Sequence, residues 1–139
     1  MRKRTAAALY WLPVAIWMGV IFFFSTLPEA MTPGRYILPD KVCHAGEYFI
    51  LALFILIALS RTGTAGLTAS FWIVLLWVTV YGLSDEIHQL YVPTRHFDLM
   101  DLAADAGGAL VLFLLLWALP RCGGWGVTLH RWLTGGARQ

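Results

Sequence analysis

Four long apolar segments run along the chain, separated by short breaks that are rich in proline, glycine and charged residues. The segments are Ala6–Leu27, Val42–Ser60, Leu67–His88 and Leu99–Leu119. A helix needs about 20 apolar residues to cross a bilayer, where lipid cannot hydrogen-bond an exposed backbone. The pattern therefore predicts an all-α integral membrane protein, a compact bundle of four transmembrane helices.

The four segments divide the chain into a membrane domain and a tail. We predict a four-helix transmembrane domain over residues 1–120 and a short tail over residues 121–139. In the tail, Trp125, Leu129 and Trp132 stand among basic residues, which is a weak amphipathic pattern. We expect the tail either to lie in the headgroup region or to be disordered.

The composition agrees with a lipid environment. Of the 139 residues, 59% are hydrophobic and 13% are charged, whereas soluble domains carry about 25% charged residues. The net charge of +2, without a basic stripe, argues against nucleic acid as a partner. The first apolar segment exceeds the ~7–15 residues of a signal-peptide core, so we expect it to stay in place as a spanning helix.

The distribution of lysine and arginine predicts the orientation in the membrane. With a cytoplasmic N-terminus, seven of the ten basic residues lie on the cytoplasmic side: Arg2, Lys3, Arg4, Arg61, Arg121, Arg131 and Arg138. Arg35, Lys41 and Arg95 lie on the opposite side, in agreement with the positive-inside rule. We therefore expect both termini in the cytoplasm.

The acidic residues are sorted to one side of the membrane by the same arrangement of helices. All eight fall at or beyond the outer ends of the predicted helices: Glu29, Asp40, Glu47, Asp85, Glu86, Asp98, Asp101 and Asp105. A carboxylate at the centre of a spanning helix costs about 2.5–3.5 kcal/mol on insertion scales. This polar end of the bundle is therefore our candidate for the working site.

Polar residues near this end recur at helical spacing on three of the predicted helices. The triplets are Asp40/His44/Glu47, Tyr81/Asp85/His88 and Asp98/Asp101/Asp105, and each triplet shares one helix face. We expect these stripes to converge on an outward-opening polar pocket, because the alternative is contact with acyl chains. For Glu29, Arg35 and Asp40 we favour a simpler explanation as ordinary groups at the membrane surface.

Two stretches of the chain carry a resemblance to a known family. DKVCHAGEYFILAL at Asp40–Leu53 resembles the D-K-x-x-H-x-x-x-Y segment of VanZ-like membrane proteins. SDEIHQLYVPTRHFDLMDLAADAGG at Ser84–Gly108 is similar to their D-E-x-x-Q…P-x-R-x-x-D-x-x-D-x-x-x-N-x-x-G segment, and Ser25 and Pro28 match their S-x-x-P. Asp105 stands where the family usually has asparagine, which adds a carboxylate beside Asp101.

The resemblance implies a small helical protein of the bacterial cytoplasmic membrane. The named representative of the family is associated with resistance to teicoplanin-type glycopeptides. A monomer or small homo-oligomer, in contact with membrane lipids, is expected.

One class of function is an enzyme. It would be a hydrolase or transferase, assisted by a metal or by acid and base groups, that acts on an anionic envelope lipid headgroup or a lipid-linked cell-envelope precursor. The candidate catalytic groups are His44, Asp85, Glu86 and Asp101, and the candidate substrate-binding groups are Ser25, Lys41, Tyr48, Gln89, Arg95 and Asp98. A divalent cation is a candidate cofactor, with hard oxygen ligands from Asp85, Glu86, Asp101 and Asp105.

The alternative class is non-catalytic. In that case the pocket binds a lipid, an antibiotic or a partner protein, and its charges form a structural ion network. The two classes share the same residues, so the sequence leaves both open. A transporter is disfavoured, because the inner half of the predicted bundle has almost no ionisable groups to form a path.

Overall fold

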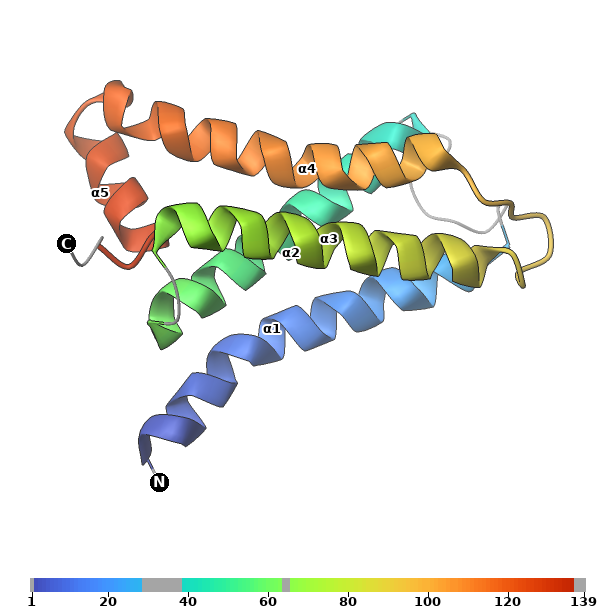
Figure 1. Cartoon of the computed structure of the whole chain (residues 1–139), viewed down its shortest axis with the longest axis horizontal. Helices are drawn as coiled ribbons and strands as arrows, with labels where there is room; N and C mark the ends of the chain where they lie inside the picture. The colour runs from blue at the N-terminus through green and yellow to red at the C-terminus, as the bar shows by residue number, and fades with distance from the viewer. Residues whose placement is uncertain (1, 29–38, 64–65, 137–139) are drawn as a thin grey trace.

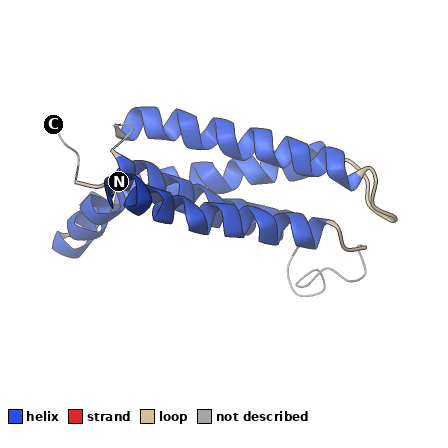
Figure 2. Cartoon of the chain, turned by 90° about the horizontal axis from the view of Figure 1, so that it is seen from below, coloured by secondary structure: helices blue, strands red, loops and turns tan. Residues whose placement is uncertain are grey.

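The described structure is built entirely from helices. The computed structural model describes residues 2–28, 39–63 and 66–136, with helices α1 (Arg2–Ser25), α2 (Asp40–Thr62), α3 (Leu67–Gln89), α4 (Leu99–Ala118) and α5 (Gly124–Leu133), and the short 3-10 helix η2 (Leu119–Cys122) between the last two (Figures 1 and 2). Helices α1 to α4 are long and apolar enough to cross a membrane. The chain is therefore a multi-pass membrane protein, as the apolar pattern predicts.

Local chemistry explains where the helices begin and end. Helix α2 starts at Asp40 because Pro39, with a ψ of 138°, is outside the helical conformation, and the Pro39 carbonyl accepts from Val42 N at 2.9 Å. The same helix ends at Gly63, whose φ of 68° is a left-handed conformation that favours glycine. Helix α4 starts after Asp98, whose side chain accepts from Met100 N at 2.7 Å.

Helix α2 is the centre of the packing. It packs against α4 and α1, while α3 packs mainly against α4. Helices α2 and α4 approach each other closely at Gly108, where a Cβ atom would collide with the Ala45 carbonyl and lie 2.8 Å from Phe49 N. An added Cβ at the neighbouring Gly107 would have nothing within 4 Å. Gly108 thus lets the two backbones come together.

The ends of the helices gather at two opposite ends of the molecule. The last turns of α1 and α3 and the first turns of α2 and α4 share one end, while α5 and the N-terminus lie toward the other (Figure 1). The acidic residues of the described segments fall in these shared turns or in the segments just beyond them. The polar end predicted from the sequence is thus a physical end of the bundle.

The tail after α4 is ordered as a helix. Arg61 of α2 donates to the Trp132 carbonyl at 2.9 Å, and its guanidinium lies 4.9 Å from the centre of the Trp132 ring. These contacts fasten α5 to the end of α2. Of the two expectations for the tail, a disordered segment is therefore wrong for residues 124–133.

Candidate functional site

The centre of the polar end is a histidine–aspartate pair between α2 and α4. His44 Nδ1 lies 3.0 Å from Asp105 Oδ1, and the two residues are 8% and 1% exposed. The close approach at Gly108, one turn after Asp105, brings the two helices near enough for this contact. Gly82 of α3 provides space on the other side, since a Cβ there would lie 2.5 Å from Asp105 Oδ2. Three helices therefore fix the Asp105 carboxylate.

A second group of charges lies one turn closer to the end of the bundle. Lys41 Nζ makes ion pairs with Asp98 Oδ2 and Asp101 Oδ1, and lies 4.0 Å from Asp40. The hydrogen bond from Lys41 lowers the pKa of the Asp98 carboxyl from its usual value. The second oxygen of Asp101, Oδ2, lies 3.9 Å from His44 Nε2. Asp101 thus connects the lysine to the buried histidine.

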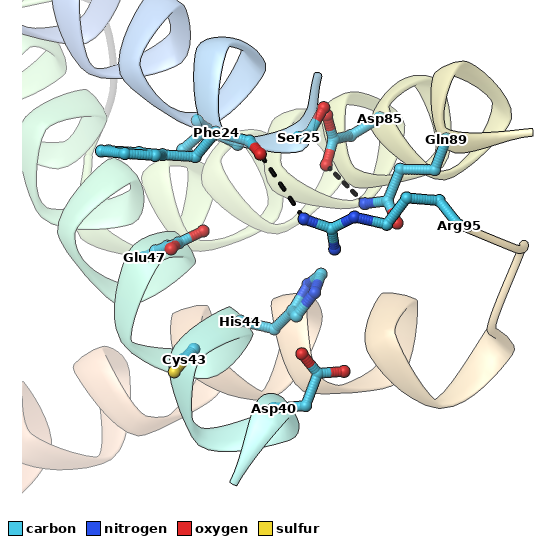
Figure 3. A pocket seen from close by; sticks show the side chains of 10 residues that line it. Phe24, Ser25, Asp40, Cys43, His44, Glu47, Asp85, Gln89 and Arg95 are labelled. Carbon is cyan, nitrogen blue, oxygen red and sulfur yellow. Dashed lines mark hydrogen bonds between the residues drawn. The ribbon is translucent and has the colours of Figure 1, made fainter. Parts of the chain in front are cut away.

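Helix α3 contributes a further buried carboxylate. Asp85 is 4% exposed, and its Oδ2 accepts from Gln89 Nε2 at 3.2 Å. Figure 3 shows Ser25, from the last turn of α1, beside Asp85. The α1 and α3 helices therefore close the site opposite His44.

The segment between α3 and α4 is held by two other charged side chains. Arg95 donates from Nε to the Leu27 carbonyl at 3.2 Å and from Nη2 to the Phe24 carbonyl at 3.5 Å. Glu86, which is fully buried, accepts from Asp98 N at 2.8 Å. These contacts attach the segment to the ends of α1 and α3.

Two cavities open among these side chains. The inner cavity, of about 30 Å³, is lined by side chains that include Ser25, Asp40, His44, Glu47, Asp85 and Arg95 (Figure 3). A single water molecule needs about 10–15 Å³ on this scale, so the inner cavity fits one or two waters or an ion. The outer cavity, of about 300 Å³, is lined by Lys41, Thr94, His96, Asp98 and Asp101 among others. Asp40, Gln89 and Arg95 line both cavities, so the two are neighbours.

A family model described as VanZ/LLP1 matches residues 10–120. The chain belongs to the VanZ/LLP1 family. No curated protein and no solved structure matches it. The matched region includes nearly all of the four spans and every residue of the two cavities, so the polar end is part of the VanZ/LLP1 domain.

The VanZ/LLP1 fold brings most of the predicted site residues together. Nine of them line the cavities or form the ion pairs around them: Ser25, Lys41, His44, Asp85, Gln89, Arg95, Asp98, Asp101 and Asp105. Glu86 lies behind them, bonded to the backbone of Asp98. Tyr48 is fully buried and packs against the Tyr81 ring at 6.1 Å, outside the lining of both cavities. The functional roles assigned to these residues stay predictions.

The two cavities are also lined by residues to which the sequence assigns no catalytic, binding or metal role. Asp40 and Glu47 line the inner cavity with His44, although we favoured a surface role for Asp40. The signal that identifies them is the helical spacing of Asp40, His44 and Glu47. Thr94 and His96, in the outer cavity, stand in a segment without periodicity, and nothing in the pattern marks them. Glu29 and Arg35 lie outside the described residues.

The site offers one compact set of metal-ligating atoms within the described segments. One ligand atom each from Asp40, His44 and Asp101 lies within 4.8 Å of the other two. The sequence predicts four metal ligands: Asp85, Glu86, Asp101 and Asp105. Of these four, Asp101 belongs to the set. Asp105 instead contacts the far nitrogen of His44, and Glu86 bonds to a backbone amide.

Proposed function

We propose that this protein acts on the headgroup of an envelope lipid or a lipid-linked cell-envelope precursor, at the centre formed by His44, Asp101 and Asp105. The polar end would face the outer side of the bacterial cytoplasmic membrane. The link between the family and teicoplanin-type resistance would then follow from a changed precursor or lipid at the cell surface.

The buried hydrogen bond between His44 and Asp105 carries this proposal. In the neutral tautomer whose Nδ1–H donates to Asp105 Oδ1, at a distance of 3.0 Å, the lone pair is on Nε2, toward Asp101. A carboxylate in this position fixes the tautomer and makes the free nitrogen more basic. Such a nitrogen either accepts a proton from an attacking water or binds a cation that activates that water.

The outer cavity supports a charged headgroup as the substrate. Its volume of about 300 Å³ is at the lower end of ligand pockets, which span ~300–1,000 Å³. It contains Lys41 and Arg95 as cations and His96 as a further donor. A phosphate-containing headgroup in this cavity would lie next to the inner cavity through the shared wall of Asp40, Gln89 and Arg95.

A lipid-facing cavity supports attachment of that headgroup to a lipid. Met18, Trp77, Val80, Tyr81 and Ser84 are among the residues that line a cavity of about 440 Å³ between α1 and α3. Its lining is mostly apolar, and it reaches Ser84, the neighbour of Asp85. An acyl chain in this cavity would place its headgroup beside the polar end.

A non-catalytic role is the second candidate, and the ion pairs favour it. Lys41 is held by both Asp98 and Asp101, and Arg95 by two backbone carbonyls. Cations that are engaged in this way are less available to a phosphate. In this alternative, the network keeps the end of the bundle in shape while the outer cavity binds a lipid, an antibiotic or a partner protein.

Turnover of defined lipids by the purified protein tests the proposal. Wild-type protein in nanodiscs would receive envelope lipid extract and lipid-linked precursors, with and without divalent cation, and mass spectrometry would identify the products. We expect a headgroup-modified or dephosphorylated product, with turnover at least about 100-fold lower in His44→Gln, because a positioned acid or base typically contributes 10²–10⁴-fold.

The matched control is His130→Gln in α5, which makes the same substitution far from the polar end. It should keep wild-type turnover. Equal turnover in His44→Gln and wild type would contradict the proposal. Lipid that co-purifies with wild type without being converted, and is lost from His44→Gln, would favour the non-catalytic alternative.

A further inference from the structure

We infer that Asp40, His44 and Asp101 form a binding site for a divalent transition-metal ion such as Zn²⁺ or Mn²⁺. This inference extends the proposed function. Only the chemical role of the ion rests on that function. Binding itself follows from the geometry of three side chains and from the support that surrounds them.

The first observation is the convergence of three ligand types that suit such an ion. One atom from each of Asp40, His44 and Asp101 lies within 4.8 Å of the others, and His44 Nε2 is 3.9 Å from Asp101 Oδ2. Ligand atoms bound at about 2.0–2.2 Å to a tetrahedral ion are roughly 3.4 Å apart. Small side-chain rotations therefore bring the three atoms to bonding distance.

The second observation concerns Nε2 of His44, the ring nitrogen that does not contact Asp105. The residue is 8% exposed, and its Nε2 makes no hydrogen bond to any residue in the described segments. This nitrogen lies 3.9 Å from Asp101 Oδ2, which is too far for a hydrogen bond. His44 and Asp40 line the inner cavity (Figure 3), which has room for an ion, and Asp101 lines the neighbouring outer cavity together with Asp40.

The surroundings of the three ligands also fit a metal site. Asp105 accepts from the far nitrogen of His44 at 3.0 Å, which is the carboxylate–histidine arrangement that orients metal-binding imidazoles. Asp101 uses Oδ1 for the ion pair with Lys41 and keeps Oδ2 toward His44. His44 and Asp101 are therefore each held by a contact that leaves the metal-facing atom, Nε2 or Oδ2, available.

The donor set indicates the class of ion. Imidazole suits zinc, iron and other first-row transition metals, while carboxylates suit harder ions such as manganese. Two carboxylates and one histidine are three protein ligands, which leaves a position open for water or substrate, as in catalytic zinc sites. In the proposed function, such an ion would polarise a phosphoryl oxygen or activate a water.

Metal binding by the full-length protein in zwitterionic nanodiscs tests the inference directly. Protein stripped with chelator would be dialysed against Zn²⁺, and bound metal would be counted by mass spectrometry. We expect one ion per wild-type chain, and affinity at least about tenfold lower in His44→Gln and Asp101→Asn. His130→Gln should bind like wild type, since it controls for metal held by a surface histidine.

A gain-of-signal variant separates loss of a ligand from loss of the fold. Asp101→Cys, loaded with Co²⁺, should show a sulfur-to-cobalt charge-transfer band that wild type lacks, because the thiolate would replace the carboxylate. Wild-type protein that binds no Zn²⁺, or a His44→Gln variant that binds it as wild type does, would overturn the inference. A folded Asp101→Cys variant that binds Co²⁺ without the band would also overturn it.

The turnover experiment and the metal-binding experiment have outcomes that distinguish the proposed function from the metal site. Lipid conversion that persists in chelator and is lost in His44→Gln would retain the proposed function and exclude the metal. Bound metal without lipid conversion would retain the site and remove the proposed enzyme.

Discussion

At the scale of single residues, Asp105 links the site to the protein interior. It is almost fully buried and contacts His44 from α4. A buried imidazole N–H needs an acceptor, and losing it costs about 1–3 kcal/mol. Either a carboxylate or an amide oxygen meets this need.

Replacement of Asp105 by two different residues separates hydrogen bonding from charge. Asp105→Asn should retain thermal stability close to that of wild type, because the amide oxygen still accepts from Nδ1–H. Asp105→Ala should lower the free energy of unfolding by about 1–3 kcal/mol, because it leaves the imidazole without an acceptor. Thermal unfolding in detergent measures both, and equal losses would argue against this hydrogen bond as the source of stability.

At the scale of elements, the contact of α2 with α4 positions the site. His44 and Lys41 come from the first turns of α2, and Asp101 and Asp105 from the first turns of α4. The backbones approach because Gly108 has no side chain where α4 meets Ala45 and Phe49. Displacing α4 here would separate the histidine from its carboxylate.

Alanine substitution at two adjacent glycines tests this packing. Gly108→Ala should destabilise the protein by about 1–3 kcal/mol, the usual effect of overpacking, because the added Cβ would collide with the α2 backbone. Gly107→Ala should be neutral or slightly stabilising, since its Cβ meets nothing within 4 Å and alanine favours helix by about 1 kcal/mol. Thermal unfolding compares the pair; equal effects would contradict the close approach.

The sequence predicted the elements better than the contacts between them. Apolar length is a property of each segment alone, so all four spans were found, with α2 longer by two residues at each end than expected. Helical spacing also placed Asp98, Asp101 and Asp105 on one face. Helical spacing does not show which helix faces contact each other. The ion pairs of Lys41 with Asp98 and Asp101, and the hydrogen bonds of Arg95 to backbone carbonyls, are therefore known only from the structure.

At the scale of the whole molecule, charge is distributed between the two ends. Acidic residues of the described segments collect at the end that contains the cavities, while Arg61, Arg121 and Arg131 lie toward the other. From the positive-inside rule we expect the arginine-rich end in the cytoplasm. The cavities would then open to the outside.

Cysteine labelling in intact cells tests this orientation. With Cys43 and Cys122 changed to serine, Leu90→Cys should react with a membrane-impermeant maleimide added outside, because Leu90 is exposed just after α3. Thr128→Cys, exposed in α5, should react only after the cells are permeabilised. The reverse pattern would invert the protein and move the cavities to the cytoplasmic side.

The pairing of the second span with the fourth has a consequence for biogenesis. During synthesis, α2 leaves the ribosome before α3 and α4, so His44 and Lys41 enter the membrane region before Asp101 and Asp105 exist. Their ion pairs form only after the last span is inserted, when α4 closes against α2. Of the carboxylates that pair with Lys41 in the finished protein, a nascent chain that stops after α3 therefore contains Asp40, at 4.0 Å, but neither Asp98 nor Asp101.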